Sequence, residues 1–398
     1  MSKDYFNGVH SYNGWRHSTM FHRTDPEMWY QGLIDRGVYL TRDGWQSHIG
    51  HNQWGGMTTD SPFPPSHRTV QANAMHPDYD ERPIALAVIE RTSSGYLVVN
   101  ESEDPNNPDW SSPDNDDPAS YKGSVPFVGF DHGNPSRAYW AKYRSTDHGH
   151  RDSWKRIQWL DDGGYEIVGM TRTRSATHQA VFAYDRRGEQ RHIARSLDGG
   201  DTWEVVLDFD LWGYNPMDLP GNRGKGIFQA HDSDPDRIWL AGPPGGSAPG
   251  GRSRHELRLV RLDEGSPDDR PYEEIDLVPE NIRTDLHSGA DFFADQLAID
   301  PRHPDVMYVT NGNIGTGVAL IRSTNRGETW ENLTGIVHDS RKSGIGVHPL
   351  TGDFLLSSPN GMFLMPPPYE EPASLFYNRP HPVTDRILSH GDAVPVDF

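Results

Sequence analysis

The chain has 398 residues, no cysteine, and 57 acidic against 37 basic side chains, which gives a net charge of −20. The lack of cysteine excludes disulfides and thiolate chemistry, and the acidic surplus argues against a general nucleic-acid binder, which needs Lys and Arg to neutralise phosphates. Aromatic residues make up 11% of the chain, which is enough bulky core material to exclude a disordered protein.

The first 25 residues lack the apolar stretch of a secretory signal, and no window approaches the ~18 consecutive apolar residues of a membrane helix. We therefore expect no membrane insertion: the protein would be virion-associated or extracellular if viral, and otherwise cytoplasmic. The bias of 40 Asp to 17 Glu and 31 Arg to 6 Lys suits a salty medium and equally a GC-rich genome.

An eight-residue segment, which we call the box, recurs along the chain. Its clearest copies are Ser196–Trp203 and Ser323–Trp330, and both read S-x-[DN]-x-G-x-x-W. A third copy, Ser145–Gly149, has the same start but reaches its aromatic residue late, at Trp154. Degenerate copies begin at Thr41, Ser102 and Arg261. The six starts lie 43 to 65 residues apart, which predicts one supersecondary unit per repeat.

Each unit is rich in β-forming residues. Runs such as 181–184 (VFAY), 237–242 (RIWLAG) and 306–312 (VMYVTNG) have strand composition, and Asp-Pro turns precede several of them. No segment predicts an amphipathic helix. The units therefore read as strands joined by turns.

The box resembles the Asp-box, or BNR, repeat of β-propellers, which occurs in sialidases, xyloglucan hydrolases and sortilin-type receptors. The boxes cover residues 41–330, and flanking strands extend the resemblance to about 22–368. It implies an all-β fold, a single seven-bladed β-propeller of four-stranded blades over residues 1–368, with the seventh blade at 343–368. A Pro-rich tail, residues 369–398, would close the last blade or dock on a partner.

The resemblance also implies that each box joins the third and fourth strands of a blade, on the face opposite the usual ligand site. An Asp carboxylate can accept backbone N–H groups of its own turn, Gly supplies a positive φ, and Trp anchors the next strand. We assign this structural role to Asp43, Asp104, Asp147, Asp198, Asp263 and Asn325.

The opposite face would be formed by long segments that carry aromatic and cationic residues. Flat aromatic rings stack on sugars, and Arg binds carboxylates or sulfates through paired hydrogen bonds. Alternatively, these side chains cap blade ends and balance nearby aspartates. The predicted ligand-binding residues are His51, Trp54, Arg68, Trp212, Tyr214, Arg223, Arg283 and His287.

A complete catalytic set is missing from the sequence. A sialidase would carry an Arg-Ile-Pro segment, and none occurs. Residues 21–39 are similar to the opening blade of xyloglucan hydrolases, which implies Asp35 as a catalytic base, but Arg36 replaces a Gly there and no partner carboxylate is identified. Asp35 is alternatively a turn residue. A polysaccharide lyase needs a base and a cation, for which Arg16 and His17 are the candidates.

We predict no cofactor and no metal site, since the acidic stretch 101–117 lacks the spacing of a calcium loop. The leading functional prediction is a non-catalytic propeller that recognises a glycan or glycosylated surface, as a capsid or tail appendage of a virus from a halophilic or GC-rich host. The alternative is a glycan-active enzyme, a polysaccharide lyase or glycoside hydrolase, with its site on the face opposite the boxes. An assembly scaffold, bound to other subunits through the C-terminal tail, is a third class.

Overall fold

A computed structural model of the protein describes the chain in segments. These are residues 19–22, 24–33, 37–43, 49–51, 69–91, 94–102, 104, 109–113, 122–123, 127–171, 179–185, 192–208, 227–231, 234–241, 256–267, 269–288, 290, 292, 294–312, 316–334, 344–358, 361–369 and 387–389. They form seven antiparallel sheets, each with four strands paired in sequence order, and one sheet has an additional fifth strand. The predicted all-β, seven-bladed β-propeller is therefore confirmed.

The first four blades span the N-terminal half of the described chain. Their strands are β1 (Thr19–Phe21), β2 (Trp29–Leu33), β3 (Gly37–Thr41) and β4 (Ile49–His51); β5 (Thr69–Met75), β6 (Ala85–Arg91), β7 (Ser94–Asn100) and β8 (Trp110–Ser111); β10 (Val128–Phe130), β11 (Ala138–Trp140), β12 (Tyr143–Ser145) and β13 (Trp154–Arg156); and β14 (Tyr165–Met170), β15 (Val181–Asp185), β16 (His192–Ser196) and β17 (Glu204–Asp208). In blade 2 a further strand, β9 (Lys122–Gly123), pairs with β7.

The last three blades follow the same order. Their strands are β18 (Ile227–Ala230), β19 (Arg237–Ala241), β20 (Glu256–Arg261) and β21 (Tyr272–Asp276); β22 (Ala294–Ile299), β23 (Met307–Asn311), β24 (Leu320–Ser323) and β25 (Glu331–Asn332); and β26 (Gly344–Val347), β27 (Phe354–Ser358), β28 (Gly361–Met365) and β29 (Ile387–Ser389). β29, which lies after residue 368, pairs with β28 as the fourth strand of the seventh blade.

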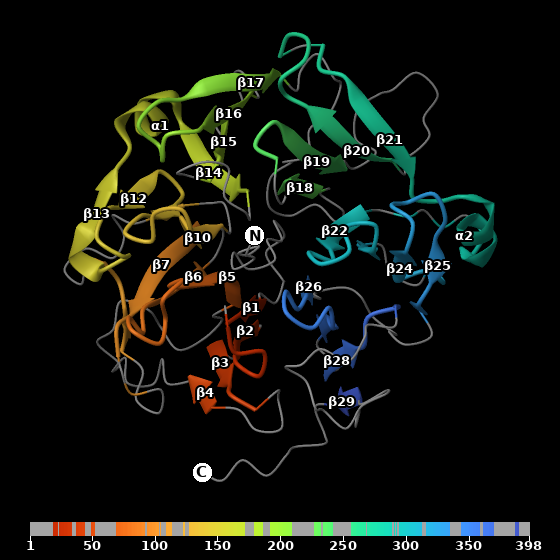
Figure 1. Ribbon diagram of the computed structural model, residues 1–398, viewed down its shortest axis with the longest axis horizontal. Helices are drawn as coiled ribbons and strands as arrows, with labels where there is room; N and C mark the ends of the chain where they lie inside the picture. The colour runs from red at the N-terminus through yellow and green to blue at the C-terminus, as the bar shows by residue number, and fades with distance from the viewer. Residues whose placement is uncertain are drawn as a thin grey trace.

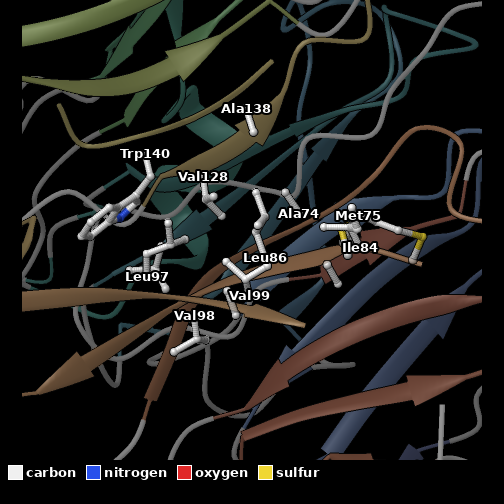
Figure 2. Close-up of a cluster of buried hydrophobic side chains, with 14 of the residues drawn as sticks. Ala74, Met75, Ile84, Leu86, Leu97, Val98, Val99, Val128, Ala138 and Trp140 are labelled. Atoms are coloured by element: carbon white, nitrogen blue, oxygen red, sulfur yellow. The ribbon is translucent and has the colours of Figure 1, made fainter. Parts of the chain in front are cut away.

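The sheets stand around a common centre, with first strands such as β5, β14 and β22 innermost and fourth strands such as β4, β21 and β29 outermost (Figure 1). Apolar side chains fill the space between adjacent blades. Leu86 and Leu97 of blade 2 and Val128 and Trp140 of blade 3 are all buried in one such cluster (Figure 2). Burial of these side chains between sheets is the main stabilising term of the ring.

Two short helices depart from the expectation of a helix-free chain: α1 (Gln158–Gly163) and α2 (Glu280–Asp285). Both lie in connections between blades. Six residues are too few for a helix to be stable by itself, so packing against the neighbouring blades stabilises them. Among the described residues, no helix is long and apolar enough to cross a membrane.

The antiparallel order fixes two faces. The turn after the first strand and the box turn after the third strand lie at the same end of each blade, because both strands run in the same direction. We call this end the box face. Turns after the second strand and connections to the next blade lie at the other end, the loop face. The boxes join third and fourth strands, as between β16 and β17 and between β24 and β25.

In the two clearest boxes, the side chain at the third position accepts hydrogen bonds from the turn. Asp198 Oδ1 accepts the backbone N–H groups of Asp201 and Thr202 at 3.0 and 2.9 Å and the hydroxyl of Ser196 at 2.8 Å. Burial opposes ionisation of this carboxyl, but the bonds from Thr202, Ser196 and Asp201 outweigh it and lower the pKa of Asp198 to about 2. Asn325 repeats the pattern, since its Oδ1 accepts from Thr329 N at 2.9 Å.

The turn after the first strand of a blade is also capped by one side chain. His22 Nδ1 accepts the backbone N–H groups of Thr24 and Asp25 at 3.3 and 3.0 Å. His76, His231 and His348 cap the corresponding turns of blades 2, 5 and 7, and Asp131 and Asp300 cap those of blades 3 and 6. Nδ1 of His and Oδ1 of Asp are the same number of bonds from Cα, so either residue fills this position.

The ring closes between blade 7 and blade 1. Phe21, Trp29 and Leu355 form a buried cluster there, with Leu364 packed against it. The ring of His348 meets Phe21 edge to face, with 4.6 Å between the ring centroids. Blades 7 and 1 therefore meet through an aromatic contact at the box face.

Candidate functional site

The connection from blade 3 to blade 4 runs from the outer strand of blade 3 past the box turn of blade 4. It contains α1, which follows the outer strand β13 directly and leads into the inner strand β14. The helix ends at Gly164, whose left-handed backbone (φ 74°) lets its N–H donate to the carbonyls of Asp161 and Leu160. Leu160 is buried and anchors the helix, whereas Trp159 is 39% exposed.

Trp159 belongs to an aromatic group that joins the two blades. Its ring is parallel to that of Trp203, at an interplanar angle of 10° and a centroid distance of 5.9 Å. That separation is an offset stack, which leaves part of the ring surface uncovered. Tyr165 lies against Trp159 at 4.8 Å and 38°. We call Trp159, Trp203 and Tyr165 the aromatic patch.

Polar and charged side chains surround the patch. Gln158 Nε2 donates to Asp162 Oδ1 at 2.7 Å, and both residues are exposed. Lys142 Nζ and Arg156 Nη1 both contact the Asp161 carboxylate, the latter at 3.3 Å. The hydrogen bond from Lys142 lowers the pKa of Asp161, so this carboxylate is ionised at neutral pH.

The positive charges here are unusual for so acidic a chain. Lys142 and Lys155 are two of its six lysines, and Lys155 and Arg156 are both exposed on the outer strand β13. The Arg156 guanidinium lies 5.9 Å from the centre of the Tyr143 ring, within the range of a cation–π contact. A flat apolar surface next to amide, carboxylate and cationic groups can bind a ligand that has both an apolar face and many hydroxyls.

Two predicted ligand-binding residues lie at the second helix. Arg283 is on α2, is exposed, and donates from Nη2 to the carbonyl of Val278 at 3.1 Å. His287 follows the helix, is exposed, and its backbone N–H donates to Thr316 O at 2.7 Å. Arg283 is thus held within the connection that follows blade 5, and the backbone of His287 is held to blade 6; both side chains are exposed.

The remaining predicted site residues are less well placed. His51 is the last residue of β4, and its side chain is not described. Eight positions lie outside the described residues: Arg16, His17, Asp35, Trp54, Arg68, Trp212, Tyr214 and Arg223. No group of three or more His, Asp or Glu side chains that could hold a metal ion occurs within the described segments.

Sequence reasoning missed Trp159, because no helix was expected near it. The available signal was local: Trp159 and Leu160 are followed by Asp-Asp-Gly-Gly, and a Gly just past a short apolar segment is a common helix stop. The contact with Trp203, a box residue of the next blade, depends on the packing of blade 3 against blade 4. It could not be read from either segment alone.

Comparison with known proteins assigns no activity to this chain. No family model and no curated protein matches the chain. Among solved structures, it is similar to YCF48 bound to D1 peptide, at 13% identity and a TM-score of 0.46 over 87% of this chain and 95% of that one. It is also similar to the PQQ-bound aldose sugar dehydrogenase of Streptomyces coelicolor (11%, TM-score 0.37, 80% and 96%) and the oligogalacturonate lyase of Vibrio parahaemolyticus (8%, TM-score 0.39, 80% and 91%). Such low similarity carries nothing about activity, and the propeller assignment rests on the strand pairing itself.

Proposed function

We propose that this protein is a non-catalytic recognition propeller that binds a glycan or a glycosylated surface through the aromatic patch between blades 3 and 4. The observation that carries the proposal is the exposed indole of Trp159, stacked on Trp203 and bordered by hydrogen-bonding side chains. The C–H face of a sugar ring is apolar and flat, and it can cover the exposed indole, while its hydroxyls bond to amides and carboxylates.

Replacing Trp159 tests the proposal. We expect Trp159→Ala to weaken glycan binding by about tenfold to a hundredfold, because a central aromatic contact contributes roughly 1–3 kcal/mol. Trp159→Phe retains a flat ring and should lose less. The measurement is affinity electrophoresis through gels that contain uronate or neutral polysaccharides, followed by calorimetry with the polysaccharide that retards the protein.

The matched control is Leu350→Ala, which removes another exposed apolar side chain, 41% exposed in the first turn of blade 7. It should leave retardation unchanged. Equal binding by wild type and Trp159→Ala would remove α1 from the binding surface, and no retardation by any polysaccharide would contradict glycan recognition altogether.

The finer assignments remain proposals of the same kind. The shared hydrogen-bond pattern of Asp198 and Asn325 supports membership of the Asp-box propellers. The excess of Asp and Arg supports a halophilic or GC-rich host. A role as a viral capsid or tail appendage, with the C-terminal tail contacting other subunits, is part of the same proposal. The alternative, a lyase or hydrolase using Arg16 and His17 or Asp35, would release unsaturated products or reducing ends from the same polysaccharides.

A further inference from the structure

The box face joins blades 2 and 3 through two histidines. His76, which caps the first turn of blade 2, accepts the backbone N–H of Asp78 at Nδ1, 3.0 Å away. Its other ring nitrogen, Nε2, lies 3.0 Å from Nδ1 of His148, in the box turn of blade 3. His76 is fully buried, at 1% exposure, and His148 is half-buried.

These contacts fix where the protons are. Because Nδ1 of His76 accepts a hydrogen bond, the proton of the neutral ring is on Nε2, which must donate to Nδ1 of His148. A second proton on His76 would point an N–H at the N–H of Asp78. A second proton on His148 would place two N–H groups opposite each other. The contact is therefore compatible only with two neutral imidazoles.

The surroundings also favour the neutral rings. Burial and then His148 lower the pKa of His76 to about 4, and burial and then Arg82 lower the pKa of His148. Asp78 acts to raise the pKa of both rings and Asp147 that of His148, but both pKa values stay below the ordinary value. The groups that face the pair are Asp78 and Arg82 from the blade 2 turn, Asp147 and His150 from the blade 3 box, the carbonyl of Pro135 and the edge of the Phe130 ring.

A similar arrangement joins blades 1 and 2. His22 caps its own turn through Nδ1, and its Nε2 lies 3.5 Å from Asp80 of the blade 2 turn. Burial lowers the pKa of His22, against the opposing effect of Asp80 and Asp25. A second proton on His22 would go to Nδ1 and break the cap of its own turn, but it would leave Nε2–H facing the Asp80 carboxylate. Acid should therefore disturb the contact between blades 1 and 2 less than the His76–His148 contact.

We propose that the His76–His148 contact is an acid-sensitive latch between blades 2 and 3, closed when both rings are neutral and released when either is protonated. This contact would act on conformation, independently of any ligand at the aromatic patch. Its direction follows from proton binding: a folded pKa below the ordinary value means that the folded state binds fewer protons than the unfolded state. The latch thus stabilises the fold above pH 6.5, and this stabilisation is lost as the pH falls toward 4.

Urea unfolding at pH 8 and pH 5 tests the latch. With a folded pKa of about 4 and an ordinary value of 6.5, protonation of His76 lowers the folding equilibrium constant roughly 30-fold between these pH values. His76→Asn keeps an acceptor at the capping position and does not titrate. The fall in its folding equilibrium constant between pH 8 and pH 5 should therefore be about 30-fold smaller than that of the wild type. His303→Asn is the control, because His303 is an exposed residue in the blade 6 turn, where Asp300 is the cap. An equal pH dependence of wild type and His76→Asn would overturn the proposal.

Two measurements on the wild-type chain locate the effect and do not depend on a variant that folds. In an NMR titration of ring-labelled histidine, His76 should titrate well below 6.5 with its proton on Nε2; a value of 6.5 or above would overturn the latch. Amide exchange, corrected for its intrinsic pH dependence, should rise at pH 5 in the blade 3 box turn around Gly149 more than in the blade 4 box turn around Gly200, which contains no histidine. Equal changes in both turns would likewise overturn it.

Discussion

Gly327→Ala should destabilise the protein by about 2–5 kcal/mol. Gly327 is the fifth residue of the sixth box and has a φ of +88°, which costs an L-residue roughly 1–2 kcal/mol. An added Cβ would also lie 2.3 Å from Cγ2 of Ile275, a stiff, buried side chain on β21 of the preceding blade. Relieving that overlap requires blades 5 and 6 to move apart, at a further cost of about 1–3 kcal/mol.

The chain provides a matched control at the same box position. Gly200 has a φ of +86°, and its N–H donates to Ser196 Oγ at 2.8 Å, as that of Gly327 donates to Ser323 Oγ at 2.7 Å. An added Cβ at Gly200 meets nothing closer than 3.5 Å. Gly200→Ala should therefore lower the stability only by the cost of the positive φ, roughly 1–2 kcal/mol. Urea unfolding of both variants measures the difference, and equal losses would show that the contact with Ile275 is not a tight one.

Asp198→Ala should cost about 2–3 kcal/mol of stability. The substitution removes the acceptor for the backbone N–H groups of Asp201 and Thr202 and for the Thr202 hydroxyl, and leaves these groups to water in a tight turn. Asp198→Asn should cost much less, because Asn325 fills the equivalent position in the sixth box with the same bond to the backbone. Urea unfolding at pH 7 compares the three proteins.

The same carboxylate predicts a dependence on acid. The pKa of Asp198 is lowered to about 2, so its contribution is complete above its ordinary value of 3.8 and is lost as the pH falls toward 2. Asp198→Asn should not show this loss. A loss of stability below pH 4 that is the same in both proteins would place the acid-sensitive group elsewhere.

The boxes could be predicted because their structure is local. Ser196, Asp198, Gly200 and Trp203 act within a few residues of one another, so their spacing alone identifies a turn. The capping histidines are equally local, and their sequence signal was present: His or Asp stands shortly before a turn rich in Asp and Pro in most blades. Their capping role was not predicted because a histidine is usually considered as a base or a cation and not as a hydrogen-bond acceptor equivalent to aspartate.

Features that depend on two blades could not be predicted. His76 meets His148, and Trp159 meets Trp203, only because the sheets are packed at one particular distance and twist. The six-residue helix α1 exists for the same reason, since its sequence is too short to form a helix in water. The predicted glycan-binding residues remain predictions, because only Arg283 and His287 among them have described side chains.

Each of the seven sheets draws its strands from one continuous stretch of sequence, and blades 7 and 1 meet through the side chains of Phe21, Trp29, Leu355 and His348. The repeating unit of the gene is therefore also the unit of the architecture. Duplication or deletion of one such unit would change the number of blades without separating any strand from its partner. By this route the ring could gain or lose a blade in evolution, because only the side-chain contacts between neighbouring sheets would have to adjust.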